Sequence, residues 1–265
     1  MLATLDAPTV PQLCDKLLAT SSALATLMRQ VSDPTPNAVG VWSLGETAAH
    51  VSRSAIYFLG AASGDGALES LGELGSASSQ MLARDRERDP RKLADRLELG
   101  ERALVEFAQG VLGDPPVHPF EGVEVPLSTL LGVELGELLV HGFDIANAAG
   151  LKWHIETTAA LMTLRAYLPM FPHTLDPARA HGVRLALEIR VRGMPPVFVS
   201  IADDRLTVTA TSAGAVDAHV GVAPVAYLLL MWNRIPTWKP MLHGQLVVWG
   251  RRPWRAAELG ALMLT

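Results

Sequence analysis

The fold of this chain is decided by the stretch 127-LSTLLGVELGELLVHGFDIANAA-149, which Gly150 follows. Its apolar residues fall on nearly every side of a 3.6-residue period, and this pattern predicts a helix that is buried on most of its surface. Gly150 supplies the usual C-terminal stop of such a helix. We therefore expect residues 127–149 to lie inside the N-terminal, helical part of the protein.

Polar residues occur on this apolar helix in a single stripe. Glu134, Glu137, His141 and Asp144 are spaced by three, four and three residues, so their side chains share one face. A buried carboxylate costs several kcal/mol to desolvate unless it is paired, hydrogen-bonded or bound to a metal. The stripe therefore needs a partner elsewhere in the chain.

A second predicted helix offers that partner. It starts after Ser43, an N-cap residue with Glu46 three positions later as its capping-box partner, and it runs to about Gly60. One face of this helix is also polar, so the two helices can meet along facing polar stripes. Its members are Ser43, Glu46, His50, Arg53 and Tyr57.

Together the two stripes contain a candidate metal site. Glu137 and His141 at positions i and i+4 can chelate one ion from a single helix, and His50 would complete a set of two imidazoles and one carboxylate. Three protein ligands leave a fourth position open, as in catalytic zinc sites. The site residues predicted for a metal are therefore His50, Glu137 and His141.

A simpler interpretation stays open at this point. An ExxxH pair on a helix is common by chance, and Glu46 with His50 forms a second one here. On that interpretation, a buried Glu and His hydrogen bond to each other or to Arg53. Glu46 is then a helix cap, Asp144 holds a histidine tautomer, and Glu134 faces solvent.

The remaining pattern predicts two domains, at residues 1–172 and 178–265. Helices are expected from Leu13 to Val31, after Asp89-Pro90 and from Glu156 to Tyr167, with residues 63–79 as a loop or short helical turns. Pro169, Pro172 and Pro177 mark the boundary.

Beyond the boundary the apolar period changes to about two. Strands are expected at residues 185–191, 197–201, 206–211 and 246–249, with Asp203-Asp204 in a hairpin turn and helices at 224–232 and 253–264. The fold class is therefore α plus α+β, with an antiparallel sheet in the C-terminal domain.

Composition excludes several classes of protein. The net charge is −5 and the pI about 5.9, without a Lys/Arg cluster of the kind that neutralises nucleic-acid phosphates. Cys14 is the only cysteine, so a disulfide or a cysteine-rich zinc site cannot form within the chain. Neither a signal peptide nor a membrane-spanning stretch is recognisable. We expect a cytoplasmic protein with no nucleic-acid or membrane partner, and the sequence leaves the oligomeric state open.

The two histidine motifs also carry a family resemblance. Residues 42–50, WSLGETAAH, and residues 137–144, ELLVHGFD, match W-S-x-x-E-x-x-A-H and E-x-x-V-H-G-x-D. These motifs resemble the mycothiol-dependent maleylpyruvate isomerase family, a branch of the DinB-like metal-binding proteins. The resemblance implies an N-terminal four-helix bundle whose metal ligands are His50, Glu137 and His141. It also implies a C-terminal α+β domain similar to sterol carrier proteins.

The same resemblance implies a chemistry. A divalent metal, zinc above all, would bind mycothiol, a thiol of actinobacteria, and hold it as the nucleophilic thiolate. An isomerase would add this thiolate to a cis double bond and release the trans product, whereas an S-transferase would keep the adduct. Arg234 matches an arginine implicated in the family's activity, although Asn233 stands where a Gly usually precedes it.

Two other functions remain as alternatives. The protein could be a non-catalytic module that binds a lipid or another small molecule in its C-terminal domain. It could also be a metal-dependent hydrolase whose open position holds water. In each case the expected ligand or substrate is a small molecule.

Overall fold

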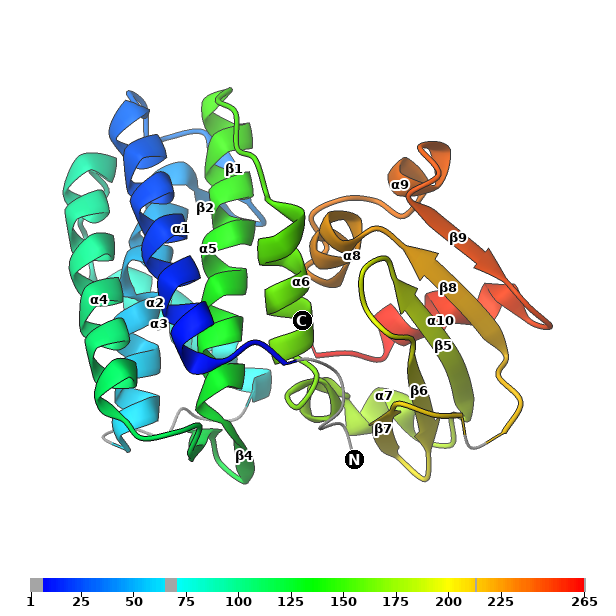
Figure 1. The fold of residues 1–265 in the computed structure, drawn as a ribbon. Helices are drawn as coiled ribbons and strands as arrows, with labels where there is room; N and C mark the ends of the chain where they lie inside the picture. The colour runs from blue at the N-terminus through cyan, green and yellow to red at the C-terminus, as the bar shows by residue number, and fades with distance from the viewer. Residues whose placement is uncertain (1–6, 65–70, 213, 265) are drawn as a thin grey trace. The chain divides into compact units, whose positions relative to one another are not determined.

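The computed structural model describes residues 7–64, 71–212 and 214–264. The chain combines helices with a sheet and divides into two compact units, residues 8–159 and residues 160–264, the latter with Ala7 (Figure 1). The division falls inside α6 (Thr157–Ala166). Among the described residues, none of the helices is long and apolar enough to cross a bilayer.

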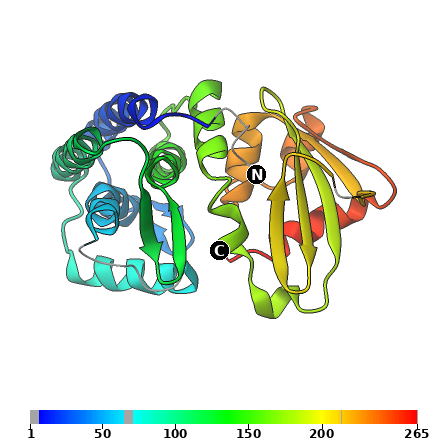
Figure 2. The ribbon, with the colours of Figure 1, turned by 60° about the horizontal axis from the view of Figure 1, so that its bottom comes forward.

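The first unit is built on four long helices: α1 (Val10–Gln30), α2 (Leu44–Ser63), α4 (Pro90–Gly110) and α5 (Leu127–Ala149). Both α1 and α2 pack against α4 and also against α5, so the four helices surround one core (Figure 2). Leucines dominate this core and are fully buried, among them Leu13, Leu17, Leu24, Leu93, Leu97, Leu104, Leu130, Leu131 and Leu135.

The helix ends follow the local signals of the sequence. Ser43 and Glu46 form the predicted capping box of α2, and Asp89 caps α4 with Pro90 in the first turn. Gly150 ends α5 in the left-handed conformation, at φ 67°. The first helix starts at Val10, earlier than the predicted Leu13, because Thr9 forms a second capping box there.

Shorter elements complete this unit. Two hairpins that the sequence did not predict pair β1 (Asn37–Val39) with β2 (Trp42–Ser43), and β3 (Pro116–Phe120) with β4 (Val123–Pro126). Residues 63–79, predicted as a loop or short helical turns, include η1 (Leu71–Glu73) and the start of α3 (Leu74–Arg84), which is longer than a short turn. Residues 65–70 of that loop, like residues 1–6 at the N-terminus, lie outside the described residues.

The second unit contains a five-stranded sheet in the order β7-β6-β5-β8-β9. Asp203 and Asp204 both have positive φ angles and make the predicted hairpin turn between β6 and β7. The apolar residues of the central strand, Leu185 to Val191, are buried on one face. The strands are β5 (Leu185–Val191), β6 (Val197–Ala202), β7 (Arg205–Thr209), β8 (Ala218–Val222) and β9 (Leu246–Trp249).

The sheet corrects the prediction of a purely antiparallel arrangement. The sequence did not predict β8, a five-residue strand that contains Gly221, and glycine weakens a strand signal. The chain crosses from β7 at one edge to β8 on the other side of β5. There β8 pairs with β5 in parallel, while the other neighbouring strands are antiparallel. Alternating residues look the same in both arrangements, which is why the sequence could not decide between them.

Short helices occupy the rest of the second unit. They are η2 (Phe171–Thr174), α7 (Pro177–Ala180), α8 (Pro224–Met231) and α9 (Trp238–Leu242), followed after β9 by η3 (Pro253–Arg255) and α10 (Ala256–Ala261). The predicted closing helix of residues 253–264 is therefore too long. Its last residues leave the helix because the Leu264 N–H donates to the carbonyl of Thr174, at 2.7 Å.

Candidate metal centre

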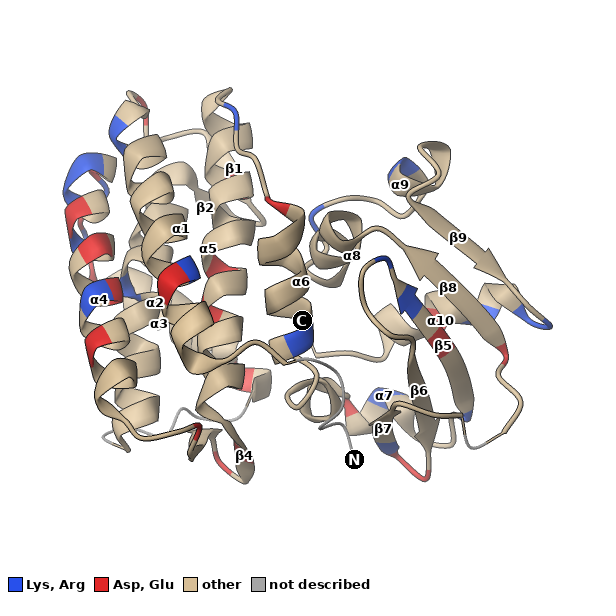
Figure 3. Cartoon of the chain, in the orientation of Figure 1, with Lys and Arg blue, Asp and Glu red and all other residues tan. Residues whose placement is uncertain are grey.

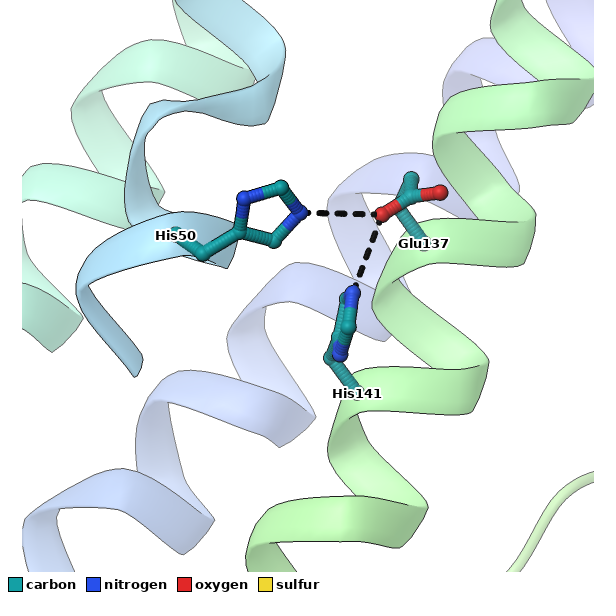
Figure 4. Close-up of side chains that lie close together, drawn as sticks. All are labelled: His50, Glu137 and His141. Carbon is teal, nitrogen blue, oxygen red and sulfur yellow. Dashed lines mark hydrogen bonds and ion pairs between the residues drawn. The ribbon is translucent and has the colours of Figure 1, made fainter. Parts of the chain in front are cut away.

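Three side chains from two helices of the first unit converge on one point. His50 comes from α2, and Glu137 and His141 come from adjacent turns of α5 (Figure 4). The Oε2 atom of Glu137 lies 3.4 Å from Nε2 of His50 and 3.1 Å from Nε2 of His141. The structure thus brings together the three residues that the sequence singled out.

Local structure explains how these side chains meet. Glu137 and His141 share a face of α5 because they are four residues apart. The Ser43–Glu46 capping box sets where α2 begins, and this start places His50 on the second turn of α2, on the side that packs against α5. Trp42 lies beside the ring of His50, with ring centroids 5.0 Å apart.

Electrostatics keep Glu137 ionised even though it lies at the edge of the helical core. Burial raises the pKa of Glu137, but hydrogen bonds with His141 and His50 outweigh burial and hold this pKa well below its usual range. An ionised carboxylate between two imidazoles is a set of ligands suited to a divalent transition metal.

Asp144 supports His141 from the side opposite Glu137. Its Oδ2 atom lies 3.1 Å from Nδ1 of His141, and both side chains are buried. Burial lowers the pKa of His141, but hydrogen bonds with Asp144 and Glu137 outweigh it and raise the pKa to about 9. The pair has the arrangement of a carboxylate–histidine–metal triad, in which Nδ1–H donates to the carboxylate and Nε2 faces the ion.

Gly142 gives this part of α5 room for a tryptophan. A Cβ at position 142 would lie 2.5 Å from the indole ring of Trp153, whose Nε1–H donates to the carbonyl of Leu139 at 3.0 Å. The glycine after His141 is therefore needed for close packing of the turn that carries two of the candidate ligands.

The three candidate ligand atoms lie within 4.8 Å of one another, and the two distances that involve Glu137 fit a small tetrahedral ion. With zinc bonds of about 2.0–2.1 Å to nitrogen and oxygen, tetrahedral ligand atoms are roughly 3.3 Å apart. The distances from Glu137 to the two histidines, 3.4 and 3.1 Å, lie on either side of this value. His50 and Glu137 are partly exposed whereas His141 is buried, so one side of the group is open.

A second polar cluster lies one turn away along α5. Glu134 is fully buried and accepts a hydrogen bond from Ser54 Oγ at 2.6 Å, so the expectation that it faces solvent is wrong. Its neighbour is Glu101 of α4, which is also fully buried. Burial, with the two carboxyl groups beside each other, raises the pKa of Glu134 well above its usual value, and burial raises that of Glu101 to about 7.

Sequence reasoning missed Glu101 and Ser54 for different reasons. Glu101 belongs to a helix of otherwise ordinary amphipathic pattern, and the signal that could have revealed it is its position on the apolar face of that helix, between Leu97 and Leu104. Ser54 lies one turn after His50 and therefore on the same face of α2, but a serine in a helix carries little signal by itself.

The other members of the predicted α2 stripe have separate roles. Arg53 pairs with Asp85, its Nε atom 2.7 Å from Oδ2, so the structure pairs it with neither candidate ligand from α5. Glu46 accepts from the backbone N–H of Ser43 at 2.8 Å, which confirms it as a cap. The facing polar stripes are therefore narrower than predicted, with His50 and Ser54 on α2 opposite Glu137 and Glu134 on α5.

Arg234 lies in the second unit, after α8. Its Nη1 atom donates to the carbonyl of Trp232 at 2.5 Å. Asn233 has a φ of 55°, in the left-handed region that glycine and asparagine tolerate best. The asparagine at position 233 is thus compatible with the backbone conformation that the chain adopts before Arg234.

The second unit also has an apolar pocket, lined in part by Leu164, Tyr167, Phe171, Tyr227 and Met231. Its volume is about 20 Å³, which is room for about one water molecule. A pocket of this size does not accommodate a lipid, so it gives no support to the lipid-binding alternative.

Comparisons with known proteins agree with the motifs. The family model described as the mycothiol maleylpyruvate isomerase N-terminal domain matches residues 10–146, more than half of the chain. No curated protein sequence matches the chain.

Solved structures of a maleylpyruvate isomerase are similar in fold to this chain. The crystal structure of the mycothiol-dependent maleylpyruvate isomerase is 14% identical, with a TM-score of 0.53, and the match covers 87% of this chain and 91% of that one. A histidine-to-alanine mutant of that isomerase gives the same identity and TM-score, with coverage of 84% and 88%.

Proposed function

The chain belongs to the mycothiol maleylpyruvate isomerase family, and we propose that it is a metal-dependent enzyme which uses mycothiol as its thiol cofactor on a small-molecule substrate. The reaction is an isomerisation or an S-transfer. The observation that carries this proposal is the convergence of His50, Glu137 and His141, at ligand spacing, on a point with one open side.

Residues of both helices would bind the metal, and a neighbouring carboxylate would orient one of the ligands. His50 and His141 would each present Nε2, and Glu137 would present Oε2. Asp144 would keep the proton of His141 on Nδ1, so that Nε2 keeps its lone pair for the metal. A divalent cation bound there, zinc by preference, would lower the pKa of a thiol that enters the open position.

The finer domain assignment belongs to the same proposal. We propose residues 1–172 as a DinB-like four-helix bundle that holds the metal, and residues 178–265 as a sterol-carrier-like domain. The family resemblance also assigns Arg234 to the reaction, where its guanidinium could bind an anionic group of the thiol or substrate. Arg234→Gln should then raise KM for an anionic substrate and leave the metal content unchanged.

Metal analysis of the purified protein tests the proposal. We expect about one divalent ion per chain in the wild type and a large loss in His50→Ala. His154→Ala is the matched control, because His154 is an exposed histidine of the same unit. Unchanged metal content in His50→Ala would contradict the metal site.

Measurements of enzymatic turnover test whether mycothiol is the cofactor. Consumption of maleylpyruvate should require added mycothiol and should stop when a chelator removes the metal. Ester hydrolysis in the absence of any thiol would identify a metal hydrolase instead, and would contradict the assignment of mycothiol as cofactor.

A further inference from the structure

The short helix α9 exposes the side chains that a helix normally buries. Trp238, Met241 and Leu242 have the i, i+3, i+4 spacing that usually faces a core. Here all three are exposed, Trp238 at 61% and Leu242 at 75%, and the buried residue of the helix is Pro240. The apolar face of α9 is therefore turned to solvent.

Further exposed apolar side chains follow on the edge strand of the sheet and just after it. Val247 and Trp249 on β9 and Trp254 on η3 are exposed as well. Six of the eleven exposed large apolar side chains in the described part of the chain thus lie between residues 238 and 254. Apolar side chains are usually scattered singly over a protein surface, so this concentration indicates an interaction surface. We call these six side chains the α9–β9 surface.

The charge of the same region differs from that of the whole protein. Residues 218–257 contain five Lys and Arg residues but no Asp or Glu, in a chain with a net charge of −5. Figure 3 shows no acidic residue on α8, α9 or β9. Arg252 and Arg255 pair with Asp217. Lys239 on α9 and Arg251 after β9 form no ion pair among the described residues, so their charges remain available to an anionic partner.

We propose that the α9–β9 surface docks on an anionic lipid surface, a peripheral membrane partner that the sequence did not lead us to expect. Tryptophan and aliphatic side chains on a short exposed helix can enter the interfacial layer of a bilayer, and flanking Lys and Arg are attracted to acidic headgroups. The complementarity is one of charge: Asp217 pairs with Arg252 and Arg255, whereas Lys239 and Arg251 pair with no acidic residue in the described part of the chain.

Two other occupants fit the surface less well. A nucleic acid would require a denser row of cations than five in forty residues. A second copy of the chain, docked by two-fold symmetry, would place the unpaired Lys239 and Arg251 against like charges of the same patch. An anionic lipid surface can bind both the apolar and the basic side chains. It requires no dense row of cations and brings no like charges together.

Vesicle co-sedimentation of the full chain tests the proposal. We expect binding to vesicles of phosphatidylcholine mixed with phosphatidylglycerol, weak binding to phosphatidylcholine alone, and weaker binding at high salt. Lys239→Glu with Arg251→Glu should weaken binding at least about tenfold. Trp238→Ser with Leu242→Ser should also weaken it, and should abolish any blue shift of the tryptophan emission on vesicles.

Matched variants outside the surface serve as controls. Arg86→Glu with Arg91→Glu makes the same change in net charge at two exposed positions of the first unit, and Leu112→Ser removes an apolar side chain that is 98% exposed. Both should bind vesicles like the wild type. The proposal would be overturned if the control variants lost as much vesicle binding as the surface variants, or if the wild type did not bind anionic vesicles. A dimer in solution that Leu242→Ser dissociates would also overturn it.

Discussion

Competition between a proton and the metal at His141 should make metal binding strongly dependent on pH. His141 must present an unprotonated Nε2 to an ion, yet hydrogen bonds with Asp144 and Glu137 outweigh the effect of burial and raise its pKa to about 9 in the metal-free protein. Protonated His141 prevails below that pH. Each pH unit below 9 should therefore weaken metal binding about tenfold.

The magnitude follows from the pKa. At pH 7, about two units below it, the competing proton should weaken metal affinity about a hundredfold, or about 2.7 kcal/mol. Asp144→Asn removes a carboxylate that lies 3.1 Å from Nδ1 of His141 and leaves an amide oxygen that can still accept from the ring. The pKa of His141 should fall, so the dependence on pH should level off at a lower pH in this variant.

Calorimetric titration of the metal-free protein with zinc measures both effects. In buffers of different ionisation enthalpy, the wild type should release about one proton per ion between pH 7 and pH 8. Asp144→Asn should release fewer protons and bind about tenfold or more weakly above pH 9, because its histidine is a less basic ligand.

A matched control exists in the second unit. Asp204 lies 3.1 Å from Nδ1 of His181 in an exposed pair, so Asp204→Asn should leave the proton release of metal binding unchanged. A wild-type affinity that is constant between pH 7 and pH 9 would refute the reasoning. The same holds if Asp144→Asn releases as many protons as the wild type.

The remaining predictions concern stability and are measured by urea unfolding. Gly142→Ala should lower the free energy of unfolding by about 1–3 kcal/mol because its Cβ would overlap the ring of Trp153, whereas Gly60→Ala, with open space around it, should raise it by up to about 1 kcal/mol. Equal effects at the two glycines would contradict this packing argument. Glu101→Gln should change how the free energy of unfolding depends on pH. The folded pKa of this carboxyl is raised to about 7, so the folded protein keeps a proton that the unfolded chain has already lost. The free energy of unfolding of the wild type should therefore fall by about 2.5 kcal/mol relative to the variant between pH 5 and pH 8. Parallel pH profiles would show that the folded pKa of this carboxyl is not raised. Ser43→Ala should cost about 1 kcal/mol by removing the cap of α2, and an unchanged stability would mean that the cap is dispensable.

Much of the candidate site could be predicted from local sequence. The spacing of Glu137 and His141 determines that they share a face, since four residues are close to one helical turn. The capping box at Ser43 sets the start of α2, and the stop at Gly150 sets the end of α5. These signals act over a few residues and depend on the backbone alone, so they can be recognised without knowledge of the fold.

Contacts between distant segments could not be predicted in the same way. Arg53 and His50 belong to one predicted stripe, yet Arg53 pairs with Asp85 and His50 with Glu137, because the partners of a side chain depend on which helix packs beside it. The direction of β8 relative to β5 depended on the path of the chain across the sheet.

The sequence by itself determined where the two helices of the site are capped and that Glu137 and His141 share one face, because helix spacing and capping are properties of neighbouring residues. Only the tertiary structure decided that Glu134 meets Glu101 inside the core, and that the apolar side of α9 faces solvent. Both depend on what packs against a helix. A periodic pattern tells which residues share a face, but the other elements of the fold decide whether that face is covered.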